Sequence, residues 1–293
     1  MAETPIFPRE RVTIVGVLNA TPDSFSDGGS LLDARGRLDV EAAVALGLRL
    51  EREGAHVLDV GGESTRPGSL EVPADEEIAR VVPAIEALAK ATQLPLSVDT
   101  RKGAVARAAL AAGARVVNDV SGGRFDADLL RAAAEREATL VLGHLRGVPA
   151  TMQDAPHFDD VLAEVAAELA ESVSLAQRAG VRAERIAIDP GLGFGKRHED
   201  NLTLLAHAGQ LAERLGHPIL VGPSRKAFLG RLTGDPVEAR AAATVAACAV
   251  AVFAGAHALR VHDVAAGVRA AAVGRALRGA LGPKQRASHE ARP

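Results

Sequence analysis

Two kinds of segment alternate along this chain, and their alternation is the strongest constraint on its fold. Eight short runs of β-branched and apolar residues predict strands over residues 12–18, 56–60, 96–98, 115–117, 139–142, 185–188, 219–221 and 258–261. Longer segments with apolar residues at three- and four-residue spacing predict helices over residues 40–52, 75–91, 104–112, 126–136, 158–179, 199–214, 237–254 and 264–281. A strand followed by a helix, eight times over, predicts parallel strands joined by helical crossovers. We therefore expect an α/β protein built as a single (β/α)8 TIM barrel.

Glycines just past the helical segments agree with this architecture, because a left-handed residue commonly ends a helix. They are Gly54, Gly113, Gly180, Gly216 and Gly255. The rival architecture, a doubly wound sheet, would normally carry a glycine-rich turn after its first strand, where this chain has Asn-Ala-Thr at 19–21. We expect one barrel domain over residues 11–282, with disordered tails at residues 1–10 and 283–293.

Composition narrows the class of partner. The chain has 293 residues, 47% of them hydrophobic, which is enough for one large core, and its net charge is only -3. That charge balance offers no basic surface for nucleic acid or for a membrane, so the expected partner is a small molecule. Cys248 is the single cysteine, which excludes an internal disulfide and suggests core packing in a reducing compartment. No signal peptide or membrane span is apparent, so we expect a cytoplasmic protein.

The loop after the first predicted strand is unusually long and polar. It runs over residues 19–29, and long loops in compact domains usually have a function. Phe25 lies in it among Ser, Asp and Gly, in a chain with seven Phe and neither Trp nor Tyr. A scarce ring in a polar loop suggests that it covers a ligand. The segment 61–68 makes the second βα loop long as well.

Polar residues follow every predicted strand. They are Asn19, residues 61–68, Asp99, Asn118 with Asp119, His144, residues 189–196, residues 224–226 and residues 260–263. Any one of these could simply cap the next helix. Eight together indicate a site at the C-terminal face of the barrel, where the βα loops converge.

These groups fall into two chemical sets. Arg66, Arg260 and His262, with Lys226 nearby, form a cationic set suited to a phosphate or diphosphate. Asp99, Asn118 and Asp189 form an acceptor-rich set for a ligand with several N–H donors. Phe194, between two glycines, repeats the placement of Phe25 and suits a flat ligand. The pattern predicts a site for a flat heterocycle joined to a diphosphate.

Other signatures are missing. The run 191–196 lacks the spacer and the following Ser or Thr of a Walker loop, no Cys/His cluster has zinc spacing, and neither Ser24 nor Ser224 lies in a G-x-S-x-G elbow. Nucleotide hydrolysis, structural zinc and serine hydrolysis are therefore not indicated.

The motifs resemble those of the bacterial dihydropteroate synthases of folate biosynthesis, and they follow that family's order. The similar segments are 18–29, 61–68, 97–100, 118–119, 149–153, 189–196, 224–226 and 260–263. The sequence departs from the family pattern at Gly143 and Leu145, which flank His144, at Ala227, and at Ala243-Thr244. None of these positions belongs to the two charged sets.

The resemblance implies a transferase that joins (7,8-dihydropterin-6-yl)methyl diphosphate to 4-aminobenzoate in an SN1-like reaction and releases pyrophosphate. It implies Mg²⁺, with Asn19 as its ligand, and a homodimer. It places the pterin at Asp99, Asn118, Asp189, Lys226 and Phe194, and the diphosphate at Asn19, Arg66, Arg260 and His262. The aminobenzoate site, where sulfonamides would compete, would use Phe25, Thr65, Pro67 and Lys226. Asp99, Asp189, Lys226 and Arg260 would carry the catalysis.

Two further functions fit part of the pattern. A pterin-binding methyltransferase, which passes methyl from methyltetrahydrofolate to a corrinoid, would share Asp99, Asn118 and Asp189 but has no use for a diphosphate clamp. A catalytically silent paralogue would bind pterin without turnover, although the intact cationic set argues against it. A structural or interaction module would leave the polar strand ends unexplained.

Overall fold

The computed structural model describes residues 5–21, 31–33, 36–66 and 68–281. Within them, eight parallel strands run in the order β6-β5-β4-β3-β2-β1-β8-β7. An isolated parallel bridge between Ile188 and Ile219 links the β6 edge to the β7 edge and closes the ring. The strands are β1 (Thr13–Asn19), β2 (Val57–Gly61), β3 (Leu96–Asp99), β4 (Val116–Asp119), β5 (Thr139–Gly143), β6 (Ile186–Asp189), β7 (Leu220–Val221) and β8 (Ala258–Val261). The predicted TIM barrel is confirmed, with each strand within two residues of its expected bounds.

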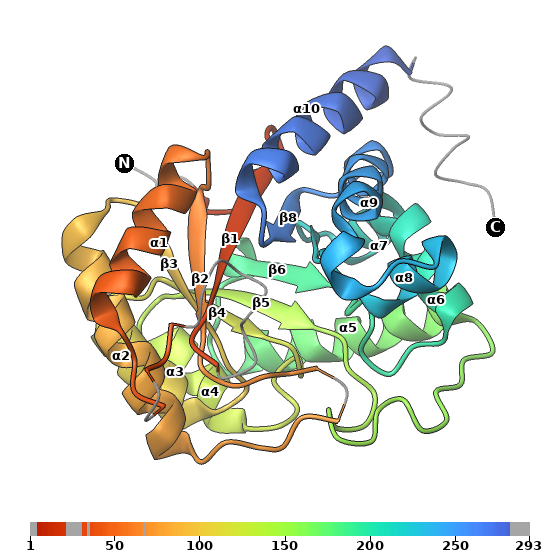
Figure 1. Cartoon of the computed structure of the whole chain (residues 1–293). Helices are drawn as coiled ribbons and strands as arrows, with labels where there is room; N and C mark the ends of the chain where they lie inside the picture. The colour runs from red at the N-terminus through yellow and green to blue at the C-terminus, as the bar shows by residue number, and fades with distance from the viewer. Residues whose placement is uncertain (1–4, 22–30, 34–35, 67, 282–293) are drawn as a thin grey trace.

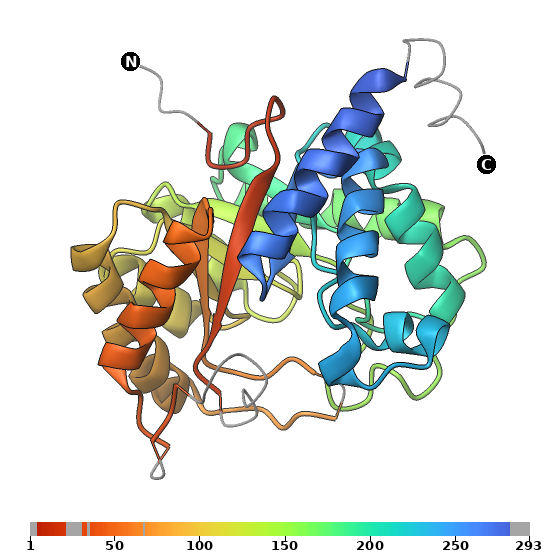
Figure 2. The ribbon, with the colours of Figure 1, turned by 45° about the horizontal axis from the view of Figure 1, so that its top comes forward.

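Helices surround the strands, as the two views in Figure 1 and Figure 2 show. They are α1 (Val40–Arg52), α2 (Ala74–Ala91), α3 (Gly103–Ala111), α4 (Ala127–Glu135), α5 (Val161–Arg178), α6 (His198–Ala206), α7 (Ala208–Leu215), α8 (Ala227–Thr233), α9 (Ala241–Phe253) and α10 (Val264–Ala280). Two short 3₁₀ turns, Ala183–Arg185 and Val237–Ala239, precede β6 and α9.

One helical prediction needs correction, and one helix was not predicted. The segment 199–214 is not one helix, because His207 ends α6 and begins α7. The break lets the backbone of Gly209 approach the end of α9, where its N–H donates to the carbonyl of Ala254 at 2.8 Å. The seven-residue helix α8 was not expected either, because a segment of two turns carries too little periodicity to be recognised.

The barrel interior contains a compact apolar layer. Val15, Val57, Val116, Val141, Ala187, Leu220 and Ala258 form it together with Phe7. Phe7 is only 4% exposed and packs on this layer, so the expected N-terminal tail of residues 1–10 is wrong at this position. Residues 1–4 and 283–293 lie outside the described residues. Outside the strands, the apolar faces of the helices bury outward-facing residues such as Ile14, Leu58 and Leu140.

The glycines expected to end helices adopt the left-handed conformation. Gly54 has φ 103° and Gly216 has φ 72°, and Gly113, Gly180 and Gly255 also have positive φ. In the part of the chain described here, no helix is both long and apolar enough to cross a membrane.

His257, in the turn before β8, predicts a pH-dependent stability. Burial, with Arg9 and Arg278 nearby, lowers the pKa of its imidazole to about 4, and Nδ1 accepts a hydrogen bond from the Ile219 N–H at 3.3 Å. The unfolded chain takes up a proton near pH 6.5 and the folded chain does not. The free energy of unfolding should therefore fall between pH 7 and pH 5, by roughly 2 kcal/mol from this group. Urea titrations of His257→Gln should show a free energy of unfolding that falls less steeply between pH 7 and pH 5.

The control for this experiment is the exposed His157, whose replacement by glutamine should leave the pH slope intact. An unchanged slope in His257→Gln would mean that His257 takes up its proton at the same pH in the folded and in the unfolded chain.

Candidate active site

A cavity of about 680 Å³ opens at the carboxyl ends of the strands, and a narrow pocket of about 30 Å³ adjoins it. The two share the side chains of Thr65, Asp99, Phe194, Lys226 and Arg260. Asn19, Arg66 and His262 line the larger cavity, whereas Asn118 and Asp189 line the smaller pocket. All the candidate site residues within the described ranges therefore surround one connected space. Phe25 and Pro67 lie outside those ranges.

Arg260 is the electrostatic centre of this space. Its Nε donates to Asp59 Oδ2 at 2.6 Å and its Nη2 to Asp99 Oδ2 at 2.7 Å. Asn118 Nδ2 lies 3.3 Å from the same Asp59 oxygen, so residues of β2, β3, β4 and β8 meet at one point. Burial raises the pKa of Asp99 to about 7, although the Arg260 guanidinium acts in the opposite direction. The neighbouring carboxylates in turn raise the pKa of Arg260 against the effect of its burial. Arg260 therefore stays charged at the floor of the cavity.

The loop after β6 forms one wall of the site. Asp189, the last residue of β6, accepts a hydrogen bond from the Gly191 N–H at 2.7 Å, and burial raises the pKa of its carboxyl. Farther along the loop, the Phe194 ring lies 3.9 Å from Lys226 Nζ, a cation–π contact. Burial lowers the pKa of Lys226 to about 8, opposed chiefly by Asp189. A carboxylate, an ammonium and an aromatic face thus meet at the narrow pocket.

On the side of β1 and β8, two polar groups face the larger cavity. His262 Nδ1 lies 2.8 Å from Ser224 Oγ, which orients the imidazole. Asn19 Oδ1 lies above Gly61, where a Cβ would come within 3.7 Å of it and within 3.5 Å of Asp99 Cβ. Asn19 and Asp99 therefore flank Gly61 at the ends of three neighbouring strands, β1, β2 and β3.

The second βα loop is tied down by a buried ion cluster. Glu63 accepts from Arg101 Nη2 at 3.1 Å and from Lys102 Nζ, and Lys102 also pairs with Glu77 at 2.6 Å. Arg80 Nη1 donates to the carbonyl of Gly62 at 2.8 Å. These contacts hold the start of the loop that carries Thr65 and Arg66.

Sequence reasoning missed Asp59, Glu63 and Lys196. Asp59 had a recognisable signal, because a carboxylate inside the predicted buried strand 56–60 requires a partner in the barrel. His144 follows β5 as expected, but its side chain does not face the site. The residue is 3% exposed and lines neither cavity, and its imidazole turns toward Glu168 on α5 and toward Lys196.

Comparison with known proteins agrees with this geometry. The family model described as pterin binding enzyme matches residues 15–262. A dihydropteroate synthase of Synechocystis sp. is 43% identical over 258 residues, which cover 88% of this chain and 87% of the relative. A structure of the Xanthomonas albilineans dihydropteroate synthase with 4-aminobenzoic acid is 51% identical, has a TM-score of 0.82, and covers 93% of this chain and 95% of its own. The same enzyme in complex with 7,8-dihydropteroate matches at 48% identity and a TM-score of 0.80, covering 94% and 96%.

Proposed function

Because the chain belongs to the pterin binding enzymes, and among them to the dihydropteroate synthases, we propose a role for each side of its cavity in joining (7,8-dihydropterin-6-yl)methyl diphosphate to 4-aminobenzoate. The observation that carries the assignment is the position of Arg260, which lies between the acceptor-rich pocket and the cationic cavity. A substrate with a donor-rich ring at one end and a diphosphate at the other matches that division.

The pterin occupies the narrow pocket. Its ring N–H groups donate to Asp189 and Asn118, and Asp99 lines the same pocket. Lys226 and Phe194, already in contact, lie beside the pterin ring. The pocket volume of about 30 Å³ is smaller than a pterin, so the ligand extends from the narrow pocket into the adjoining cavity.

The diphosphate occupies the larger cavity, where Arg66, Arg260 and His262 supply cationic and N–H donors, and Asn19 supplies an amide oxygen. The donor set fits Mg²⁺, which takes oxygen ligands and is usually held by only one or two protein groups together with substrate phosphates. The described ranges hold no group of three His, Cys, Asp or Glu side chains placed to hold a metal ion. Asn19 would be its protein ligand, and Mg²⁺ when bound would neutralise charge on the leaving diphosphate.

The aminobenzoate lies beside Thr65 and Lys226, which line both the larger cavity and the narrow pocket. Sulfonamides compete at this subsite. Phe25 and Pro67, which the sequence also assigns to it, lie outside the described residues. The arylamine is neutral at pH 7 and already nucleophilic, so no general base is needed. The barrier is the carbon–oxygen bond to the diphosphate: Arg260 and Lys226 stabilise the departing charge, while Asp99 and Asp189 stabilise positive charge on the pterin.

Product analysis tests this assignment. The purified chain, incubated with the pterin diphosphate, 4-aminobenzoate and Mg²⁺, should yield 7,8-dihydropteroate by mass spectrometry. Tight dihydropterin binding without product would instead support a silent paralogue. Methyl transfer from methyltetrahydrofolate to a corrinoid would support the methyltransferase.

A homodimer is also part of the proposal. Helices α9 and α10 lie side by side (Figure 2). They expose Val250, Val273 and Leu277 at 47%, 55% and 54%, and exposed apolar side chains suit a partner surface. Light scattering should give the mass of two chains, and Leu277→Glu should shift it toward one. Leu70→Glu, which changes an isolated residue that is 84% exposed, should leave the dimer intact. A monomeric wild-type mass would refute the dimer.

A further inference from the structure

Lys196, at the end of the loop after β6, is a buried cation that the proposed reaction does not use. Its side chain is 3% exposed, and Nζ has four acceptors within hydrogen-bond distance. They are His144 Nδ1 at 2.9 Å, the carbonyl of Phe194 at 2.9 Å, that of Gly191 at 3.1 Å and that of His144 at 3.3 Å. Burial lowers the pKa of Lys196 to about 7, opposed by the carboxylates of Asp189 and Glu168. An ammonium has three donors, whereas a neutral amine has two, so the four acceptors favour the charged form.

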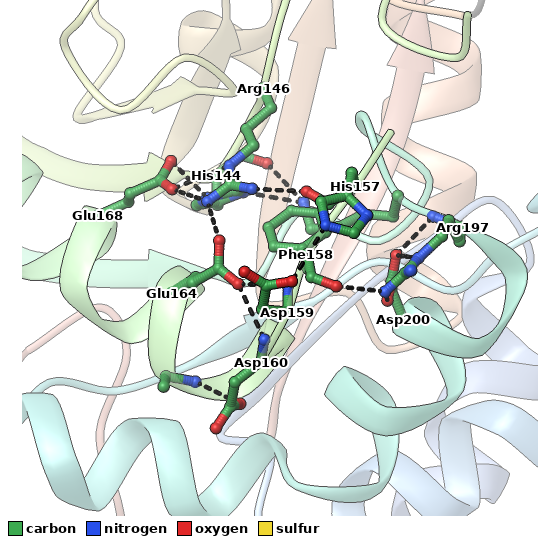
Figure 3. Close-up of polar contacts among 12 residues, drawn as sticks. His144, Arg146, His157, Phe158, Asp159, Asp160, Glu164, Glu168, Arg197 and Asp200 are labelled. Carbon is green, nitrogen blue, oxygen red and sulfur yellow. Dashed lines mark hydrogen bonds and ion pairs between the residues drawn. The ribbon is translucent and has the colours of Figure 1, made fainter. Parts of the chain in front are cut away.

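The imidazole of His144 is held in the tautomer that this ammonium requires. His144 Nε2 lies 3.0 Å from Glu168 Oε2, and Arg146 Nε donates to the other oxygen of the same carboxylate at 2.9 Å (Figure 3). Burial, with Lys196 beside it, lowers the pKa of His144 to about 4, so the ring is neutral at pH 7. Nε2 then carries the proton that it donates to Glu168, and the Nδ1 lone pair is left to accept from Lys196.

Lys196 joins two loops whose backbones press together. A Cβ at Gly191 would collide with the carbonyl oxygen of His144, and one at Gly195 would collide with that of Arg146. Converging carbonyl dipoles repel one another, and a buried ammonium among them removes that repulsion. The carbonyls that Lys196 binds belong to Gly191, whose N–H holds the Asp189 carboxylate, and to Phe194, whose ring lies against Lys226.

We propose that Lys196 is a positioning residue for pterin recognition: with His144 as its side-chain acceptor, it holds the loop after β6 so that Asp189 and Phe194 face the pterin pocket. This inference rests on the proposed function, because it assumes that the pocket lined by Asp189 binds the pterin. Lys196 also lines the larger cavity, but its Nζ is turned to His144 and to the carbonyls of the loop after β6. Replacing Lys196 should therefore weaken binding at the pterin end of the substrate site and leave binding at the diphosphate end unchanged.

The test compares the affinities of the purified full chain for two probes, 6-hydroxymethyl-7,8-dihydropterin and inorganic pyrophosphate with Mg²⁺. Lys196→Met removes the ammonium and puts an unbranched apolar side chain in place of the lysine stem. It should weaken dihydropterin binding by about tenfold or more, as expected when a hydrogen bond to a charged group is misplaced. Pyrophosphate binding, assigned to residues on other loops, should stay within about twofold.

Lys90→Met is the matched control, since it makes the same substitution at an exposed residue of α2 and should change neither affinity. If Lys196→Met does not fold, Lys196→Gln, which keeps two N–H donors, should show the same selective loss at smaller size. An equal loss of both affinities, or no loss of either, would overturn the positioning role. Failure of the wild-type chain to bind the dihydropterin would instead refute the proposed function.

Discussion

Arg260→Ala is expected to lower kcat/KM for the pterin diphosphate on the order of 10²- to 10³-fold. The guanidinium donates to Asp59 at 2.6 Å and to Asp99 at 2.7 Å, so it orders the two carboxylates. In the proposed reaction it also places positive charge beside the departing diphosphate. Its removal eliminates the stabilisation of the leaving group and leaves two buried acids close together without their cation. Steady-state rates of pyrophosphate release, with the pterin substrate varied, measure the loss.

The same substitution should also destabilise the fold by about 3–5 kcal/mol, because breaking a buried ion pair leaves uncompensated charge. Urea unfolding of Arg260→Ala separates this effect from catalysis. Arg260→Lys keeps the positive charge but lacks the planar guanidinium that donates to both Asp59 and Asp99. Compared with Arg260→Ala, it should recover more of the stability than of the activity. Arg52→Ala, at an exposed position on α1, serves as the control for both measurements. Activity within tenfold of wild type in Arg260→Ala would show that the diphosphate does not lie against this residue.

Asp189→Asn is the second large effect we expect, a fall on the order of 10²-fold in kcat/KM for the pterin diphosphate. The carboxylate accepts from the Gly191 N–H at 2.7 Å and lines the narrow pocket, where its second oxygen can accept from the pterin. An amide of the same shape directs an NH₂ group at either the loop or the ligand, so one donor is left facing another. Rates measured against varied pterin and varied aminobenzoate separate the two substrates.

The KM for 4-aminobenzoate should change little in Asp189→Asn, because the proposal assigns that substrate to Thr65 and Lys226 and not to Asp189. Asp75→Asn, at an exposed position in the first turn of α2, is the matched control. A selective rise in the aminobenzoate KM, with the pterin unaffected, would place the pterin elsewhere in the cavity.

The barrel was predictable because each strand and each long helix carries its own local periodicity. The strand ends were predictable for the same reason: once the strands are known to be parallel, residues such as Asn19, Asp99 and Arg260 must share one face. The break at His207 and the helix α8 were not predictable, because the first depends on close packing between distant segments and the second is too short to show a period.

The side-chain partners within the site were harder to predict than the positions. Sequence reasoning assigned Arg260 to the diphosphate and Asp99 to the pterin, and the ion pair between them depends on three-dimensional proximity across the barrel. His144 shows the same limitation: it follows a strand as expected, but a carboxylate on α5 and the ammonium of Lys196 turn it away from the cavity. Strand order predicts where a residue lies, whereas the charges around it decide which way it points.

The most direct test of the whole account is pyrophosphate release by the wild-type chain from the pterin diphosphate, in the presence of Mg²⁺, with and without 4-aminobenzoate. The account predicts release that depends on aminobenzoate and on Mg²⁺, with one dihydropteroate formed for each pyrophosphate. Release at the same rate without aminobenzoate, or no release while the dihydropterin stays bound, would contradict the assignment of this cavity to the synthase reaction.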